Sequence, residues 1–402
     1  MAAGLLAAAV AIPAACTPSS TDSSTQSSSD LGIEVAAARR SWWSPWRTTT
    51  TVPTTTLPTT TVAPTTTAAP TTTVPVTASP TQPPLAVLDD TPPAGSYVTP
   101  GSRLGVAGCP LFPRDNVFHA SIRSLPVKPG SANTIAAAGG AAMTLNPGFS
   151  SGVWMGSRGG YPVNVVDSRT TPRVGFLIGT YSYLSDNVGV PMPANPLVEG
   201  APGLAWDRHL LVVDSATCSS YEAWFTSPPY SQYNWGGTWT AETLVRMDLN
   251  TNQPRRLGST MAAGTSMLHG LVRYDEVATG DIDHALHLSL PSISSAPPVW
   301  PAMRTDGRDP NPANAPMGSW FRLRADADLS GLGPQALTVA RALQTHGAIL
   351  DDTGHNGATI VGEPDDRWND LDLAGLRRFN LTHFEIVDPS AMVVDPTTHQ
   401  IR

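Results

Sequence analysis

The sequence predicts a mainly β domain, a β-sandwich or jelly roll with a few peripheral helices, preceded by a disordered Thr/Pro-rich stalk. Short apolar and β-branched runs bounded by Gly, Pro, Asp and Ser recur up to residue 290, for example at 161–166, 174–181 and 209–213. Their connections are long and rich in Pro and Gly, as at 188–203. One long helical pattern stands out at 334–346, with Gly347 behind it as a stop signal.

The chain opens with an apolar run, LLAAAVAIPAAC, which is too short to span a bilayer and has the length of a signal-peptide core. The last four residues, 13–16, resemble the lipobox of bacterial lipoproteins, although Pro13 stands where Leu is usual and no Lys or Arg precedes the run. We expect residues 1–16 to be a signal peptide and Cys16 to carry lipid. The protein would then be exported and anchored to the outer face of the cytoplasmic membrane, at the cell surface; an ordinary cleaved signal is the alternative.

Residues 17–100 are predicted to be a disordered linker rich in Ser, Thr and Pro. An island of Trp and Arg at 39–47 either touches a membrane or wall polymer or has no role. Residues 48–88 carry no charge and repeat Thr triplets with Pro, a composition that favours extended chain. Such a segment reaches on the order of 100 Å, the length of a stalk through a cell wall.

A change to mixed composition marks the folded domain, expected at 101–388, with 389–402 as a C-terminal tail. With 24 basic and 32 acidic residues and no basic stripe, the chain is an unlikely nucleic-acid binder. A monomer is expected. If Cys16 carries lipid, Cys109 and Cys218 remain as a pair in an exported domain, and we predict that they form a disulfide. Two buried thiols are the alternative.

The densest set of ionisable residues lies at 268–291. Asp275 and Gly280 have the types that begin and end a short helix, and residues 282–290 have the alternation of a strand. That alternation places His284 on the leucine face and His287 on the opposite face. His284 is therefore expected either in the core or at the floor of a cleft.

Three segments form a series: FPRDNVFH at 112–119, DRH with VD and C-x-x-YE at 207–222, and GLVRYDEV-x-x-G-x-I-x-HAL at 270–286. The series resembles a widespread group of secreted bacterial proteins of unassigned function, over nearly all of residues 105–388. The resemblance implies an exported, jelly-roll-like domain, and domains of that architecture often handle polysaccharide. Phe118 departs from the group, which tends to have Trp-Asn after a Pro there.

Two polar groups supply catalytic candidates: His209 and Glu222 in the first, Arg273, Glu276 and His284 in the second. Glycoside hydrolysis needs two carboxyls roughly 5 to 9 Å apart across a cleft, which Glu222 with either Asp275 or Glu276 could provide. A lyase needs a base and a cation that neutralises a uronate, and the histidines and Arg273 have those types. We predict that all five approach one groove. The alternatives are hydrogen-bonded core histidines and a helical pair of Glu276 with Arg273.

Aromatic residues crowd the segment 221–239, where loop rings could stack on sugars or serve as core contacts of a long loop. The substrate-binding candidates are Trp224, Tyr230, Trp235, Trp239 and Tyr274. An oxygen-rich segment at 351–357 makes Asp351 and Asp352 minor candidates for Ca²⁺, although Asp, Asn and Gly also form plain turns. No other metal and no cofactor is expected.

The sequence thus predicts a cell-surface lipoprotein whose domain binds or cleaves extracellular polysaccharide, as a glycoside hydrolase or lyase. The alternative is a non-catalytic wall-binding or structural surface protein.

Overall fold

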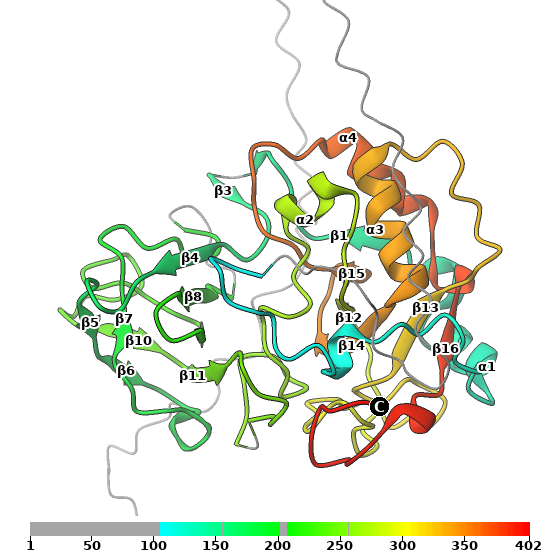
Figure 1. The fold of residues 1–402 in the computed structure, drawn as a ribbon, viewed down its shortest axis with the longest axis horizontal. Coiled ribbons are helices and arrows are strands. Elements are labelled where there is room, and N and C mark those ends of the chain that lie inside the picture. The colour runs from blue at the N-terminus through cyan, green and yellow to red at the C-terminus, as the bar shows by residue number, and fades with distance from the viewer. Residues whose placement is uncertain (1–104, 155, 202–206, 256) are drawn as a thin grey trace, which may run out of the picture. The chain divides into compact units, whose positions relative to one another are not determined.

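A computed structural model describes residues 105–402 apart from 155, 202–206 and 256. The predicted signal peptide, Cys16 and the Thr/Pro-rich linker lie outside the described residues. The described part is mainly β with few helices, which confirms the predicted class (Figure 1). Among its helices, none has the length and apolar character that crossing a membrane requires.

The larger sheet has six strands in the order β1-β15-β12-β14-β13-β16. Strand β12 pairs parallel with β14, whereas β13 is antiparallel to both β14 and β16. Residues 348–350 are fully buried, as expected for a strand covered on both faces. The strands are β1 (Leu145–Pro147), β12 (Leu286–Leu290), β13 (Trp320–Leu323), β14 (Ala348–Thr353), β15 (Ala358–Ile360) and β16 (Phe384–Val387).

Helix α3 (Pro334–Thr345) packs against this sheet (Figure 1). Val339 and Leu343 recur at helical spacing and are fully buried, and Gly347 follows with φ 68°, so the predicted helix at 334–346 is confirmed. Shorter helices occur along the rest of the described chain. They are α1 (Ser131–Ala137), α2 (Tyr274–Thr279), α4 (Asp370–Leu373) and the 3-10 turns η1 (Val117–His119), η2 (Gly140–Ala142), η3 (Ser182–Leu184), η4 (Ala374–Arg378), η5 (Leu381–His383) and η6 (Ser390–Met392).

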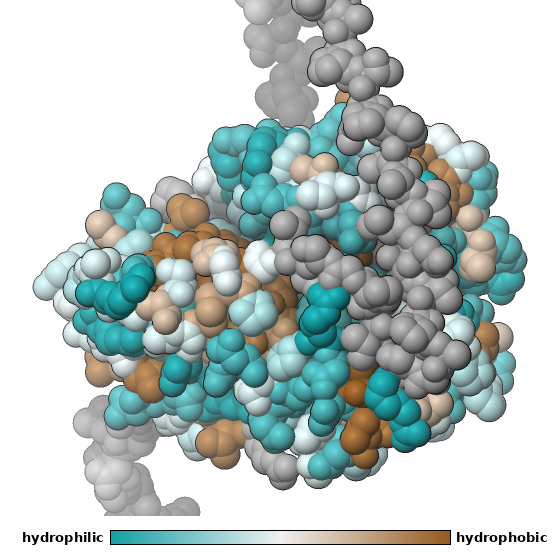
Figure 2. Space-filling view, in the orientation of Figure 1, coloured by the Kyte–Doolittle hydropathy of each residue, from teal (hydrophilic) through white to brown (hydrophobic). Residues whose placement is uncertain are grey.

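A second sheet has the order β11-β9-β8-β4, formed by β4 (Val163–Val166), β8 (Leu210–Asp214), β9 (Ser219–Trp224) and β11 (Thr243–Asp248). It packs over its own apolar core, which includes Leu210, Val212 and Leu244. Strand β4 lies at its edge with Val165 51% exposed, and apolar side chains gather over the surface that carries β4 (Figure 2). The remaining strands form three pairs: β2 (Val153–Trp154) with β3 (Ser157–Arg158), β5 (Arg173–Val174) with β7 (Val190–Pro191), and β6 (Phe176–Ile178) with β10 (Trp239–Ala241).

The predicted Cys109–Cys218 disulfide is present, with a Cα–Cα distance of 5.2 Å. It joins the first described segment of the chain to the turn between β8 and β9. The bridge therefore ties the entrance of the domain to the second sheet.

The predicted division at residue 388 does not appear in the fold. Met392 and Ile401 are buried in the core, and Gln400 pairs with Asn116 near the start of the domain. Residues 389–402 are therefore part of the domain, because they supply apolar side chains that the N-terminal segment covers.

The helix predicted within 268–291 is confirmed: α2 ends at Gly280, which has φ 84°. Its N-cap is Arg273, and Asp275 instead pairs with Arg367 at the surface. The strand begins at Leu286 rather than at residue 282 because the backbone N–H of Ala285 donates to the carbonyl of Phe118. His284 lies before the strand, so the predicted alternation does not apply to it, and both His284 and His287 are buried.

Candidate functional site

The five candidate catalytic side chains are all buried and do not line one open groove. The exposed fractions are 0% for Glu222 and His284, 2% for His209 and Glu276, and 6% for Arg273. They lie in three hydrogen-bonded groups. The prediction of a single aromatic-lined groove is therefore wrong for these residues.

Arg273, Glu276 and His284 form the first group. Arg273 Nη2 donates to one oxygen of Glu276, and His284 Nε2 lies 3.2 Å from the other. Burial disfavours the charged imidazole of His284, but Glu276 outweighs it and the pKa of His284 is raised. Arg273 also donates to the carbonyl of Gly105, so this group ties α2 to the first described residue.

His209 forms the second group with Glu199, whose Oε2 lies 2.6 Å from His209 Nδ1. Tyr161 stacks at a tilt against the imidazole, with 4.3 Å between ring centroids. Burial disfavours the protonated ring, yet Glu199 reverses that effect and raises the pKa of His209.

Glu222 forms the third group and holds a loop. Its carboxylate accepts from Ser266 Oγ at 2.6 Å, the backbone N–H of Met267 at 2.9 Å, Ser220 Oγ at 2.9 Å and Thr260 Oγ1 at 3.3 Å. Three of these donors belong to the segment between β11 and α2. Glu222 on β9 therefore fixes where that segment lies.

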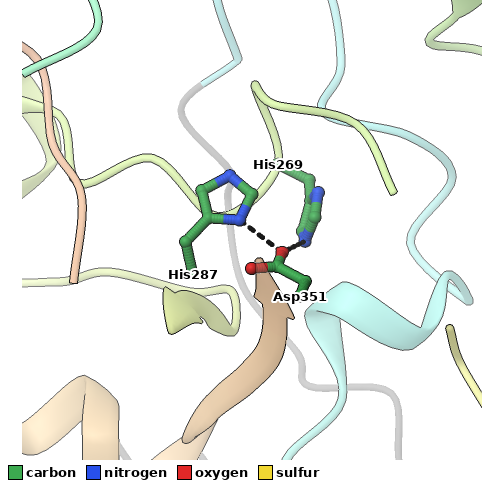
Figure 3. Close-up of side chains that lie close together, drawn as sticks. All are labelled: His269, His287 and Asp351. Carbon is green, nitrogen blue, oxygen red and sulfur yellow. Dashed lines mark hydrogen bonds and ion pairs between the residues drawn. The ribbon is translucent and has the colours of Figure 1, made fainter. Parts of the chain in front are cut away.

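The same segment leads to a cluster of His269, His287 and Asp351, drawn in Figure 3. His287 is on β12 and Asp351 on the parallel neighbour β14, whereas His269 follows the loop that Glu222 holds. The exposed fractions are 0–1%. One ligand atom from each of the three side chains lies within 4.8 Å of the others. Three distant parts of the chain thus bring two imidazoles and a carboxylate together.

Close packing fixes both imidazole rings. Phe118 stacks on His269 with 3.4 Å between ring centroids and 22° between planes. A Cβ on Gly270 would lie 2.7 Å from His287 Cγ, so only glycine lets the backbone pass this close to the ring. Phe118 and the backbone of Gly270 therefore each pack directly against one of the two rings.

The Ca²⁺ candidates Asp351 and Asp352 lie in a strand and not in an oxygen-rich turn, because β14 runs to Thr353. Asp351 is fully buried beside two histidines, and Asp352 is partly buried. Burial, followed by the neighbouring charge of Asp351, raises the pKa of Asp352 to about 8. A calcium loop of the expected kind is therefore not formed there.

Aromatic rings form a continuous strip on the surface, which we call the aromatic strip and define as Tyr181, Tyr183, Trp224, Phe225 and Tyr233. Successive centroids are 6.4 Å apart from Tyr183 to Tyr181, 5.9 Å from Tyr181 to Trp224 and 5.5 Å from Trp224 to Phe225. The guanidinium of Arg208 then lies 3.9 Å from the Phe225 centroid and 4.7 Å from that of Tyr233. Three of these rings are exposed, by 39% (Phe225), 41% (Tyr233) and 68% (Tyr183).

The loop beyond the strip is held in place by Asn234. This side chain is 8% exposed and donates to the carbonyls of Ser227 and Thr238 at 3.2 and 2.7 Å. Phe225 and Tyr230 have φ values of 56° and 53°, a left-handed conformation that costs free energy in residues with a side chain. Such strain is often found where a loop has a binding role.

Of the substrate-binding candidates, Trp224 lies in the strip, and Tyr230 and Trp235 are exposed on the adjoining loop by 81% and 88%. Trp239 is buried against Phe176 with 5.7 Å between centroids. Tyr274 lies elsewhere, edge-on to Trp368 and beneath Arg367. Trp239 thus acts as a core contact of the loop, the alternative considered for these rings.

The residues that sequence reasoning missed are His269, Tyr181 and Tyr183. His269 has no motif spacing to His287 or Asp351, and the two tyrosines precede Trp224 by more than a strand's length. Only their sequence neighbourhoods, a segment rich in ionisable groups and one rich in aromatics, offered a signal. A scan against protein-family models and searches of curated proteins and of solved structures found no match to this chain.

Proposed function

We propose that this chain is an exported lipoprotein, anchored through Cys16, whose domain binds an extracellular polysaccharide without cleaving it. The single observation that carries the proposal is the aromatic strip with its exposed rings. A row of rings offers apolar faces to the C–H faces of successive sugars. The polymer is expected to lie along the strip and across the loop that carries Tyr230 and Trp235.

Pre-organisation supports this proposal. Asn234 fixes the loop backbone, and Arg208 is sandwiched against Phe225 and Tyr233. Rings that are already in place lose little conformational entropy when a ligand binds. Rings exposed by 68% to 88% at Tyr183, Tyr230 and Trp235 bury apolar surface only when something covers them.

We prefer a binding protein to a hydrolase or lyase because the candidate catalytic side chains are buried. An acid or base must reach a proton on the substrate, directly or through one water. The five catalytic candidates are at most 6% exposed, and each has partners within the protein. Each side chain therefore has a structural task.

The sandwich or jelly-roll architecture remains a proposal about how the sheets pack. Strand pairs β12–β14 and β4–β8 are parallel, and a jelly roll is built from antiparallel strands. The same parallel pairs also depart from the antiparallel sheets of the common β-sandwiches.

Binding is tested by sedimentation with insoluble wall polysaccharides and by titration with soluble fragments. Tyr183→Ala and Trp235→Ala each remove one exposed ring and are expected to weaken binding about 3- to 10-fold, since a ring contact contributes about 0.5–1.5 kcal/mol. Leu371→Ala is the matched control, because Leu371 is 89% exposed and lies outside the strip. Equal affinity of all variants and the parent chain would refute the strip as the binding surface.

The anchor is tested separately with Cys16→Ala, which is expected to release the protein into the medium because the apolar run alone is too short to hold it. Unchanged membrane fractionation of the variant would contradict lipidation at Cys16. Reducing-sugar and unsaturated-uronate assays on the parent chain test the absence of cleavage.

A further inference from the structure

We infer that His269, His287 and Asp351 form a binding site for a divalent transition-metal ion of the Zn²⁺ type. The ligand atoms are His269 Nε2, His287 Nδ1 and the Asp351 carboxylate. The site is independent of the proposed polysaccharide surface.

The hydrogen bonds of the two imidazoles leave one lone pair on each ring pointing at Asp351. His269 Nδ1 contacts the carbonyl of Ser266, and His287 Nε2 lies 2.6 Å from the carbonyl of Met267. A carbonyl can only accept, so both of these nitrogens carry a proton. In the neutral rings, the other nitrogens, His269 Nε2 and His287 Nδ1, are therefore unprotonated.

Those two nitrogens face a carboxylate, which is also an acceptor. His287 Nδ1 is 2.5 Å and His269 Nε2 3.9 Å from Asp351 Oδ2. Within the described residues, His269 Nε2 and Asp351 Oδ1 are buried and have no hydrogen-bond partner. One proton can bridge His287 Nδ1 and Asp351 Oδ2, but His269 Nε2 and Asp351 Oδ1 then still have no hydrogen-bond partner. A cation at this point interacts with all three side chains.

The distances suit a small ion after a slight shift of the carboxylate. Ligands about 2 Å from a tetrahedral ion lie about 3.3 Å from one another. The two observed separations, 2.5 and 3.9 Å, lie on either side of that value. Two imidazoles and one carboxylate favour a transition metal over Ca²⁺ or Mg²⁺, which prefer oxygen ligands.

Backbone carbonyls and a carboxylate hold the proposed ligands in place. In known metal sites, hydrogen-bonding groups behind the histidine ligands orient them in the same way. The carbonyls that fix the two imidazoles belong to Ser266 and Met267, and Glu222 holds both residues by their Oγ and N–H groups. Thr265 Oγ1 donates to Asp351 Oδ2 at 3.2 Å. Glu222 is thus a positioning residue for this site.

Burial indicates a structural role for the ion. All three ligands are at most 1% exposed, so a bound ion would join β12, β14 and the loop held by Glu222. A small cavity of about 110 Å³ is lined in part by Phe118, whose ring stacks on His269, and by Ser266, whose carbonyl contacts His269 Nδ1.

The test uses the full chain carrying a purification tag without histidine. After chelator treatment and dialysis, ZnCl₂ is added and metal content is measured by mass spectrometry. We expect one Zn²⁺ per chain, X-ray absorption that shows two imidazole ligands, and a melting temperature raised by about 4 °C at a hundredfold excess over Kd. His269→Gln and Asp351→Asn should each lower the affinity about 10-fold or more.

His399→Gln is the matched control, since His399 is also a buried histidine whose ring contacts a backbone carbonyl and Phe118. It should bind Zn²⁺ as the parent does. No stoichiometric uptake by the parent, or bound zinc without two imidazole ligands, overturns the inference even if a cluster variant fails to fold. Parent-like affinity in folded His269→Gln also overturns it.

Discussion

Removing the Glu222 carboxylate is expected to destabilise the domain strongly, although no substrate reaches it. The carboxylate is fully buried and accepts four hydrogen bonds, three of them from the segment that precedes α2. Glu222→Ala leaves the buried N–H of Met267 without an acceptor and opens space beside it. Glu222→Gln keeps the shape, and the hydroxyls of Ser220 and Ser266 can turn to accept from the new amide.

The expected size follows from these contacts. Hydrogen bonds to a charged group contribute about 1.5–3 kcal/mol each, and the cost of burying the carboxylate offsets part of their sum. Loss of the carboxylate should therefore lower the free energy of unfolding by about 3–5 kcal/mol in Glu222→Ala, against about 1–2 kcal/mol in Glu222→Gln.

The measurement is urea unfolding followed by circular dichroism, with the disulfide intact and a chelator present so that no bound ion contributes. Asp326→Ala serves as control, because Asp326 pairs with Arg324 at the exposed surface and its loss should leave the free energy of unfolding close to that of the parent. A loss below about 1 kcal/mol in Glu222→Ala would show that the four contacts do not hold the loop. Equal losses in the Ala and Gln variants would show that the negative charge of the carboxylate matters and the shape of the side chain does not.

Two further predictions concern the bridge and a buried histidine. Replacing Cys109 and Cys218 together by Ala opens a loop of 109 residues, for which chain entropy gives a loss of about 4–5 kcal/mol in urea unfolding; a loss below about 1 kcal/mol would contradict it. Glu199, with help from Asp207 and Asp352, raises the pKa of His209 despite burial, so charged His209 stabilises the fold below about pH 6.5, and this contribution is lost as the pH rises through the folded pKa. Glu199→Gln should therefore lower the melting temperature more near about pH 6 than near about pH 9, and an equal loss at both would refute the coupling.

Local signals in the sequence predicted the elements that depend on near neighbours. Pro334, the apolar spacing after it and Gly347 define α3, and Gly280 ends α2 as its type suggests. The disulfide, which the structure confirms, was predicted from the expected export of the chain and from its cysteine count. The helix ends depend on residues that are close together in the sequence, and the disulfide depends on the number of cysteines, so neither requires knowledge of the fold.

The candidate site depends on long-range pairing, which one sequence does not reveal. From the sequence alone, Glu222 could equally be a carboxylate in a cleft. Its structural role becomes visible only with its hydrogen-bond donors, Ser220, Ser266 and the N–H of Met267. His287 and Asp351 meet because β12 and β14 are parallel neighbours, although their strands are separated along the chain by β13 and α3. His284 is buried, as one of the two expected alternatives had it, but the strand starts two residues after it, so the alternation argument was not the reason.

The position of the disulfide has a mechanical consequence. Any pull transmitted along the N-terminal segment reaches Cys109 early in the described domain and passes through the covalent bridge to Cys218, at the turn between β8 and β9. The β4-β8-β9-β11 sheet then bears the load first, while residues 110–122 lie behind the bridge and cannot be peeled away in sequence. Phe118, which covers His269, lies within the loop that the bridge closes and is thus protected from tension on the N-terminal segment.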